Sequence, residues 1–387
     1  MKFTNAELEL VKEALINHKS SNNFVEVFEK NFSDYINSKY AISCNSGTSG
    51  LHAALYAAGV RPGDEVIIPG LTVIMDAYAV LYLNAIPIFV DVKLDTHLID
   101  PEDIKRKITS KTKAIITVSW DGVMCEMDTI NKIAKENNII VIDDSARTVD
   151  GFYKDTISGK AADITVFSFE SKKHLTSGGE GGMITTDNKE FAANARKFIG
   201  IGYSHLNAEG GATHLALSNV QDPNYLRFDK VAPNYRLNQI SAAVGIGQLK
   251  RVKEIVGLRK KIGNLFLERT KNLASWFIPQ YVPKDQINAY YTFSARYTLN
   301  YKNKKWKDFY NEYIERGGDG FYGSVMNPYL EPALKHKTFS YQKLDRGLCP
   351  NSELLQSQLM CFKTNYRDLE SAKEKVEILV NLIESWK

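Results

Sequence analysis

The sequence predicts an α/β protein in which helices cover both faces of a mostly parallel β-sheet. Between residue 40 and about residue 190, Val- and Ile-rich runs of four to six residues alternate with stretches of helical periodicity. The chain has 387 residues, and single hydrophobic cores stop growing at roughly 250–300 residues. We therefore expect a large domain over residues 1–250 and a smaller α+β domain over residues 251–387.

The expected strands of the large domain are short, apolar and buried in character. They cover residues 40–44, 65–69, 87–91, 114–118, 139–142, 164–169 and 182–186. Helical patterns separate most of them, at residues 50–58, 72–83 and 127–137. We expect the last two strands to form a hairpin-like pair at an edge of the sheet.

The composition changes near residue 200. Residues 200–233 are polar and have no sustained period, so we expect a functional loop or an interface segment there. Residues 237–273 have a helical pattern, residues 289–297 form an aromatic strand, and residues 369–386 form a terminal helix. These elements build the smaller domain.

Composition excludes several classes of protein. The net charge is +4, from 49 basic and 45 acidic residues, which gives no basis for nucleic-acid binding. The four cysteines have no metal-binding or disulfide spacing, so we expect neither a metal site nor a disulfide framework. No signal peptide or membrane span is visible, and we expect a cytoplasmic protein that does not bind membranes.

A lysine and an acid provide the strongest chemical signal. Lys173 lies five residues after Ser168, just before a glycine-rich run at residues 178–182. Upstream, the apolar strand at residues 139–142 leads into Asp143 and Asp144. Pyridoxal 5′-phosphate (PLP) chemistry needs a lysine amine that forms a Schiff base with the cofactor aldehyde. It also needs an acid that keeps the pyridine nitrogen protonated.

Residues 45–49, with the sequence NSGTS, lie at a strand-to-helix junction. The amide groups of a helix N-terminus, Gly47, and the hydroxyls of Ser46 and Thr48 would form a phosphate cradle. An ordinary helix cap is the alternative, since Ser and Thr are preferred at that position. Together with the lysine and the acid, the pattern favours the phosphate site.

Two adjacent pairs remain ambiguous from the residues alone. Either Asp143 or Asp144 could face the pyridine nitrogen, and the other would be a solvated turn carboxylate. Similarly, one of Lys172 and Lys173 would bind the cofactor, and the other would be a surface charge.

The chain resembles the DegT-type sugar-nucleotide aminotransferases, a family within the fold type I PLP enzymes. The resemblance extends over nearly the whole chain and rests on six motifs in the family's order. They lie at residues 45–55, 62–69, 87–92, 141–146, 168–182 and 234–238. Each is weak alone, but the ordered set is highly specific.

The resemblance implies a role for individual residues. Lys173 would be the Schiff-base lysine, and Asp144 would contact the pyridine nitrogen. Residues that hold the cofactor phosphate would be Ser46, Gly47, Thr48 and Ser168, with Asn234 reaching it from a neighbouring subunit. The resemblance therefore implies a homodimer with active sites at the subunit interface.

The implied reaction is transfer of an amino group, with L-glutamate as the usual donor, to the keto group of a nucleotide-linked sugar in surface glycan or polysaccharide biosynthesis. One alternative keeps this reaction but uses a small phosphorylated ketone or cyclitol as the acceptor. Another is a catalytically silent relative that binds PLP as a regulatory protein. Turnover of the cofactor would distinguish the silent relative from the two enzymes.

Three departures from the family pattern concern the site. Arg147 stands where Gln or His usually contacts the cofactor's phenolic oxygen; it could replace that contact, reach a substrate anion, or turn outward. Val73 stands where many relatives place a stacking aromatic, so the ring would be covered by an aliphatic side chain or by another residue, such as Trp120. An extra glycine precedes Glu180 and would reshape the substrate mouth.

Some relatives replace the lysine with histidine and act as dehydratases. Lys173 argues against that route, although His174 lies beside it. Residues 317–323 and 327–329 combine glycines with aromatics, and we expect them to shape the acceptor pocket or to form ordinary turns and core contacts.

Overall fold

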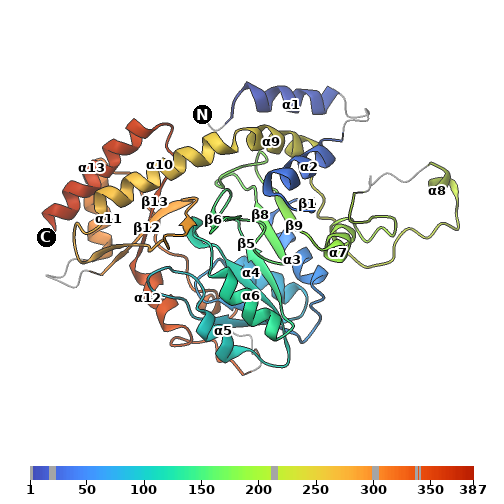
Figure 1. The fold of residues 1–387 in the computed structure, drawn as a ribbon, viewed down its shortest axis with the longest axis horizontal. Coiled ribbons are helices and arrows are strands. Elements are labelled where there is room, and N and C mark those ends of the chain that lie inside the picture. Colours follow the sequence, from blue (N-terminus) through green and yellow to red (C-terminus); the bar gives the residue numbers. More distant parts are fainter. Residues whose placement is uncertain (1–2, 17–22, 211–216, 299–304, 336–338, 340) are drawn as a thin grey trace.

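The computed structural model describes residues 3–16, 23–210, 217–298, 305–335, 339 and 341–387. Its centre is a seven-stranded sheet (Figure 1). In spatial order the strands are β1 (Tyr40–Cys44), β9 (Gly182–Thr186), β8 (Ile164–Ser168), β5 (Ile140–Asp144), β4 (Thr112–Val118), β2 (Glu65–Pro69) and β3 (Ile86–Val90). The pairs from β8 to β3 are parallel, and β9 is antiparallel to both of its neighbours. The predicted α/β class is confirmed.

The position of β9 corrects one expectation. Strands β8 and β9 do pair as antiparallel neighbours, but they do not lie at the edge of the sheet. The first strand, β1, adds to the far side of β9 and becomes the edge. Since β1 precedes β9 by more than a hundred residues, local periodicity could not reveal this pairing.

Side chains alternate along the strands and form one apolar layer on each face of the central sheet. On β8, Phe167 packs with Phe28 and Phe32 of α2 (Phe24–Ile36), whereas Val166 packs on the opposite face. That opposite face is covered by α3 (Gly47–Ala57) and α7 (Lys189–Ile199). Because successive strand residues point to opposite faces, both faces are apolar and covered by helices.

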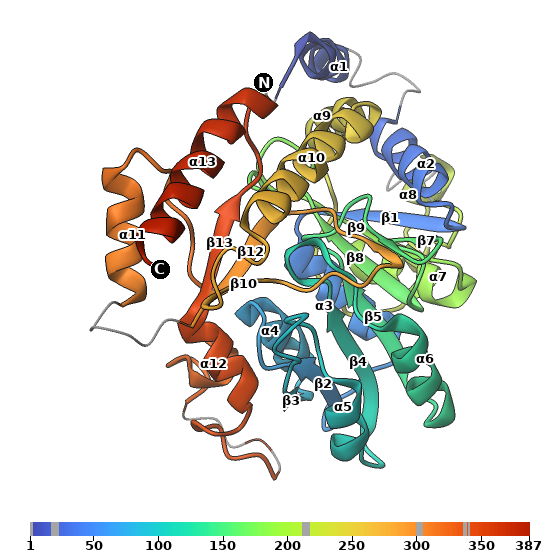
Figure 2. The same ribbon diagram turned by 60° about the vertical axis from the view of Figure 1, so that its left-hand side comes forward.

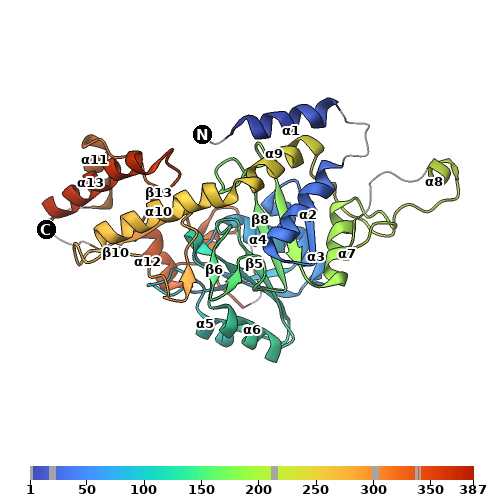
Figure 3. The same cartoon turned by 45° about the horizontal axis from the view of Figure 1, so that its top comes forward.

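Further helices pack around the central sheet and the helices that cover it. They are α1 (Asn5–Ile16), α4 (Ile74–Tyr82), α5 (Pro101–Lys107), α6 (Met127–Glu136) and α9 (Gln239–Lys250). Helix α1 lies along α9 (Figures 1 and 3). Two 3-10 turns (Trp120–Gly122 and Pro328–Leu330) and a small sheet of β6 (Phe152–Tyr153), β7 (Thr156–Ile157) and β11 (Gln286–Ile287) also occur.

A second core lies beyond the end of the central sheet (Figure 2). Its antiparallel sheet contains β10 (Phe277–Pro279), β12 (Thr292–Tyr297) and β13 (Leu359–Lys363), and its helices are α11 (Trp306–Glu315) and α13 (Leu369–Ser385). Helix α10 (Val252–Thr270) connects the two cores, because Val256 packs near α9 while Phe266 packs against the aromatic rings of the second core. The single helix predicted at residues 237–273 is therefore broken into two at Arg251.

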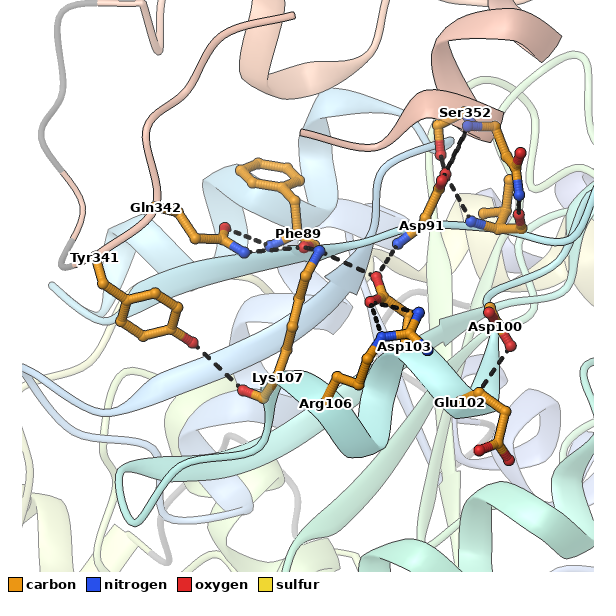
Figure 4. A network of polar contacts seen from close by, with 12 residues as sticks. Phe89, Asp91, Asp100, Glu102, Asp103, Arg106, Lys107, Tyr341, Gln342 and Ser352 are labelled. Atoms are coloured by element: carbon orange, nitrogen blue, oxygen red, sulfur yellow. Dashed lines mark hydrogen bonds and ion pairs between the residues drawn. The ribbon is translucent and has the colours of Figure 1, made fainter. Parts of the chain in front are cut away.

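A polar network attaches the C-terminal segment to the central sheet (Figure 4). The carboxylate of Asp91, which follows β3, accepts hydrogen bonds from the backbone amides of Asn351 (2.9 Å) and Ser352 (2.8 Å) at the start of α12 (Pro350–Gln358). The side-chain amide of Gln342 pairs with both backbone groups of Phe89, at 2.9 and 3.0 Å. These contacts hold the C-terminal segment close to the carboxyl end of the sheet.

The described parts of residues 200–233 form irregular chain that extends away from the body of the molecule (Figures 1 and 3). Within its described part is the short helix α8 (Leu217–Gln221), and residues 211–216 of this predicted loop lie outside the described residues. Among the described residues, no helix is long and apolar enough to cross a bilayer.

Candidate active site

The predicted lysine and acids meet at the carboxyl end of the parallel strands. Asp144 is the last residue of β5, and Ser168 is the last residue of the adjacent strand β8. Lys173 lies in the loop that follows Ser168. In open α/β sheets ligands bind beyond this edge of the strands.

The alternation of β5 separates the two acids. Asp143 is buried and accepts hydrogen bonds from the hydroxyls of Thr117 (2.8 Å), Ser119 (3.1 Å) and Ser145. Burial raises the pKa of Asp143 to about 6, although these hydroxyl contacts oppose the rise. Asp143 is thus occupied by hydroxyl groups of the protein, which leaves Asp144 as the acid that faces the lysine.

Asp144 shares its surroundings with a second buried acid, Asp76, on α4. Asp144 accepts the amide of Ala146 at 2.9 Å, and Asp76 accepts the hydroxyl of Thr72, while Oδ1 of Asp76 is buried without a hydrogen-bond partner among the described residues. Burial raises the pKa of both carboxyls, and the neighbouring Asp144 charge raises the pKa of Asp76 further. Each of two buried carboxyls this close opposes the ionisation of the other.

Lys173 is half-buried and faces these acids. Its amine lies 5.4 Å from the centroid of the Tyr291 ring. Burial lowers the pKa of Lys173, and the positive charge of Arg147 lowers it further, against the opposite effect of Asp144. A larger fraction of the amine is therefore neutral than in a solvated lysine, as a nucleophile requires.

The neighbours of Lys173 point elsewhere. Lys172 is exposed. His174 is buried, and its Nε2 lies 3.0 Å from the carbonyl oxygen of Ala289. Burial therefore favours Lys173 over Lys172 as the candidate nucleophile.

The junction at residues 45–49 is both a helix cap and a close approach of two chain segments. The hydroxyl of Ser46 accepts the amide of Ser49 at 3.1 Å, as a cap does. Gly47 begins α3 directly against Ser168, and a Cβ added to Gly47 would lie 2.9 Å from Cβ of Ser168. Gly47, Thr48 and Ser168 are thus brought together at a helix N-terminus, where amide groups lack intrahelical partners.

Arg147 turns inward. Its Nη1 forms an ion pair with Oδ1 of the buried Asp121 at 2.8 Å, and its guanidinium stacks 3.9 Å above the Trp120 ring. Burial lowers the pKa of Arg147, but the charge of Asp121 raises it more, so the guanidinium stays charged. Trp120 is buried in the large core, as one of its two expected roles requires, and it also stacks on Arg147.

A cavity of about 380 Å³ opens beside Arg147. Its lining combines basic side chains with aromatic and glycine residues of both cores: Trp120, Arg147, Lys172, Arg259, Tyr291, Thr292, Gly320, Tyr322, Gly323, Val325, Cys361, Lys363 and Asn365. Part of the segment 317–323 therefore does line the pocket. In contrast, Asn327 donates to the carbonyl oxygen of Gly70 at 2.9 Å and Tyr329 packs on Phe89, so both are structural.

Val73 and Asn234 are the two remaining predicted residues. Val73 is half-buried at the position that precedes α4, three residues before Asp76. Asn234 is exposed, and its side chain accepts from Nε of Arg236 at 2.9 Å. A single chain does not bring Asn234 into contact with Lys173 or Ser168 among the described interactions.

The sequence matches the DegT/DnrJ/EryC1/StrS aminotransferase family over residues 2–378. The chain belongs to this family. A GDP-perosamine synthase of Caulobacter vibrioides is 37% identical over 274 residues, covering 70% of this chain and 69% of the relative. The GDP-perosamine synthase of Escherichia coli O157:H7 is 34% identical, covering 76% of this chain and 75% of the relative.

Solved structures of aminotransferases share the fold. The aminotransferase from Psychrobacter cryohalolentis superimposes with a TM-score of 0.86 at 27% identity, covering 99% of this chain and 97% of that one. The family membership confirms the resemblance seen in the sequence. The protein is a PLP-dependent aminotransferase.

The residues of this aminotransferase fit PLP. Gly47 can lie this close to Ser168 only because it has no side chain. The space that a side chain would fill at the N-terminus of α3 is therefore open to a phosphate. The buried Asp144–Asp76 pair offers a carboxylate to a protonated ring nitrogen, and Oδ1 of Asp76 has an unused acceptor there. Lys173 supplies an amine of lowered pKa on the same side.

Four residues of the site were not identified as site residues from the sequence: Asp76, Asp121, Arg259 and Tyr291. Asp76 did carry a signal, because it is the single acid in the apolar helix at residues 74–82. Asp121, Arg259 and Tyr291 reach the site through the packing of distant elements, which no local pattern reveals.

Proposed function

We propose that this aminotransferase moves an amino group from L-glutamate to the keto group of a nucleotide-linked sugar, in the synthesis of a surface glycan or polysaccharide. The observation that carries the transamination is the half-buried Lys173 of lowered pKa facing Asp144. The acceptor class is supported by relatives named GDP-perosamine synthase and by a Bacillus subtilis relative, 32% identical, named spore coat polysaccharide biosynthesis protein SpsC.

The roles of the chain's residues follow from their positions. When bound, PLP supplies an aldehyde and an electron-withdrawing ring. Ser46, Gly47, Thr48 and Ser168 would bind its phosphate, Asp144 would accept a hydrogen bond from its ring nitrogen, and Val73 would cover its ring. Lys173 Nζ would take the proton from the substrate carbon that bears the amino group, a role for which burial lowers the pKa of its amine.

We also propose a homodimer in which Asn234 acts in the partner's site. Asn234 is exposed in the single chain and follows a projecting segment. That segment carries exposed apolar side chains, with Leu226 85% and Val231 100% exposed. Exposed apolar side chains beside a functional residue are typical of an interface.

We propose a cytoplasmic location as well. The four cysteines are buried and unpaired, which supports a reducing, cytoplasmic location.

The first test is the visible spectrum of the PLP-loaded protein before and after addition of L-glutamate. We expect the band of lysine-bound cofactor to convert to the amine form, and the amine form to be reoxidised by a GDP-linked keto sugar. Lys173→Ala should lack the starting band and lose activity by a factor on the order of 10³ or more. Lys172→Ala, the matched control, should retain both.

Other outcomes distinguish the alternatives. If only a small phosphorylated ketone or cyclitol converts the amine form back to the lysine-bound cofactor, the acceptor assignment is wrong and the transamination stands. If no amine changes the spectrum of the loaded protein, a silent PLP-binding relative is the better description.

A further inference from the structure

Arg259 of α10 is a buried cation without a matching acid. Its side chain lines the cavity beside Arg147, and the residue is only 7% exposed. Its hydrogen bonds are donated by Nη1, to the carbonyl oxygen of Tyr291 at 3.1 Å and to the hydroxyl of Thr364 at 3.4 Å. Within the described part of the chain, no carboxylate forms an ion pair with Arg259.

The other basic residues of the cavity are in different situations. Arg147 pairs with Asp121 at 2.8 Å, Lys363 pairs with Asp319 at 3.0 Å, and Lys172 is exposed to water. Burial lowers the pKa of Arg259 to about 10, which reflects a charge that is not neutralised by a neighbouring acid. An unpaired buried charge is costly, and a protein keeps one where an anion will bind.

The geometry places this charge near the reacting lysine. The Tyr291 ring centroid lies 5.9 Å from Cζ of Arg259, 5.2 Å from Cζ of Arg147 and 5.4 Å from Nζ of Lys173. Since the hydrogen bonds of Arg259 to described residues use Nη1, the edge formed by Nε and Nη2 remains for a ligand. Two parallel N–H groups of a guanidinium match the two oxygens of a carboxylate.

We propose that Arg259 binds the carboxylate of the amino-acid donor and thereby positions the donor's amino group at Lys173. This inference rests on the proposed function, whose donor is L-glutamate. The α-carboxylate of an amino acid is bonded directly to the carbon that loses the proton. The phosphates of a nucleotide-linked sugar are several bonds from its keto carbon, so a cation that lies beside the same Tyr291 ring as Lys173 suits the carboxylate better.

The test measures the two halves of the reaction separately in PLP-loaded Arg259→Gln. With L-glutamate, we expect the concentration for half-maximal conversion to the amine form to rise about tenfold or more, because a charge-assisted pair is lost. With the keto sugar nucleotide, we expect the return reaction to change less than about threefold. Arg269→Gln, which removes an exposed arginine of the same helix that is paired with Glu377 at 2.7 Å outside the cavity, should leave both halves nearly unchanged.

A binding measurement avoids dependence on turnover. Glutarate carries carboxylates but no amino group, and its binding can be followed through the fluorescence of Trp120, which lies on Arg147. We expect glutarate to bind the wild type and Arg269→Gln, and to bind Arg259→Gln at least about tenfold more weakly. Inorganic phosphate and GDP, tested in parallel, should be affected much less by Arg259→Gln.

A folding control is available. The Tyr291 carbonyl oxygen also accepts the Thr364 hydroxyl at 3.1 Å, so Arg259→Gln leaves it with a donor. The melting temperature of ligand-free Arg259→Gln should therefore equal or exceed that of the wild type. If the variant fails to fold, Arg259→Lys, which keeps a charge without the planar fork, replaces it and should show weakened glutarate binding.

The results separate the two proposals. Unchanged half-saturation for L-glutamate together with unchanged glutarate binding would overturn the role of Arg259, whatever the acceptor. Equal damage to the keto sugar half, or stronger effects on phosphate and GDP than on glutarate, would assign Arg259 to the acceptor and also overturn it. Failure of the wild type to aminate any nucleotide-linked sugar contradicts the proposed acceptor and leaves the glutarate result intact.

Discussion

At the scale of residues, the charges around Lys173 determine how readily its amine reacts. Burial and the positive charge of Arg147 both lower its pKa, whereas Asp144 and Glu170 raise it. Arg147 is itself fixed by Asp121 and by its stacking on Trp120. The guanidinium is therefore a fixed charge whose effect on the lysine can be removed by substitution.

Arg147→Gln should move the pH profile of PLP capture upward. Without the positive charge, and with Asp121 left unpaired, the pKa of Lys173 rises toward its ordinary value and less neutral amine is present at a given pH. We expect the pH of half-maximal capture rate to increase by up to about one unit. Stopped-flow absorbance of apoprotein mixed with PLP over a pH series measures this.

Lys172→Gln is the matched control for this measurement. It removes an exposed charge that is not among the main causes of the lowered pKa of Lys173, so its profile should lie close to that of the wild type. An unchanged or lower midpoint in Arg147→Gln would show that Arg147 does not tune the lysine.

At the scale of elements, α10 links the two cores and contains two glycines in unlike surroundings. A Cβ on Gly257 would have no atom within 4 Å, whereas a Cβ on Gly263 would lie 2.1 Å from Cγ of Tyr290. Gly263 thus allows the helix to approach the Tyr290 ring, while Gly257 only weakens the helix.

Gly257→Ala should stabilise the protein by about 0.5–1 kcal/mol, because alanine favours a helix interior. Gly263→Ala should destabilise it by about 1–3 kcal/mol, because the added methyl group overpacks the Tyr290 contact. Midpoints of urea unfolding, with circular dichroism to verify native helix content, measure both. Equal effects of the two substitutions would contradict this account of α10.

The elements also show which parts of the fold were predictable. The predicted bounds of the central strands lie within a few residues of the observed ones. Runs such as β2 and β4 are apolar on both faces, so they are recognisable as buried strands. The break at Arg251 was not found, since the apolar positions of α9 and α10 read as one helix. The order of the strands, with β9 between β8 and β1, depends on contacts distant in sequence.

For the site, Lys173, Asp144 and the 45–49 junction were predictable because each follows or precedes a recognisable strand. The choice between Asp143 and Asp144 needed either the resemblance or the structure, since it depends on which face of β5 each residue occupies. Arg259 and Tyr291 come from α10 and from the chain before β12, and only the packing of the second core brings them to the lysine. The division at residue 250 stays a prediction.

At the scale of the whole molecule, the proposed dimer makes each site depend on two chains. Lys173 and Ser168 lie within one chain, while Asn234 lies exposed beyond a projecting segment. Residues from different chains in one site can be tested by complementation.

Mixed dimers of Lys173→Ala and Asn234→Ala should regain activity. One of the two sites in such a dimer would combine Lys173 of one chain with Asn234 of the other, and would be intact. We expect activity per mixed dimer of about half the wild-type value, from one site in two, after the two inactive variants are mixed and exchanged. No recovery in a verified mixed dimer would place Asn234 in the site of its own chain.

The contact between Gln342 and Phe89 has a consequence for solubility. Strand β3 is the free border of the sheet, where unpaired N–H and C=O groups can recruit a strand of another molecule and start aggregation. The Gln342 amide occupies both groups of Phe89 as a neighbouring strand would. The C-terminal segment therefore covers part of this edge and should oppose edge-to-edge aggregation.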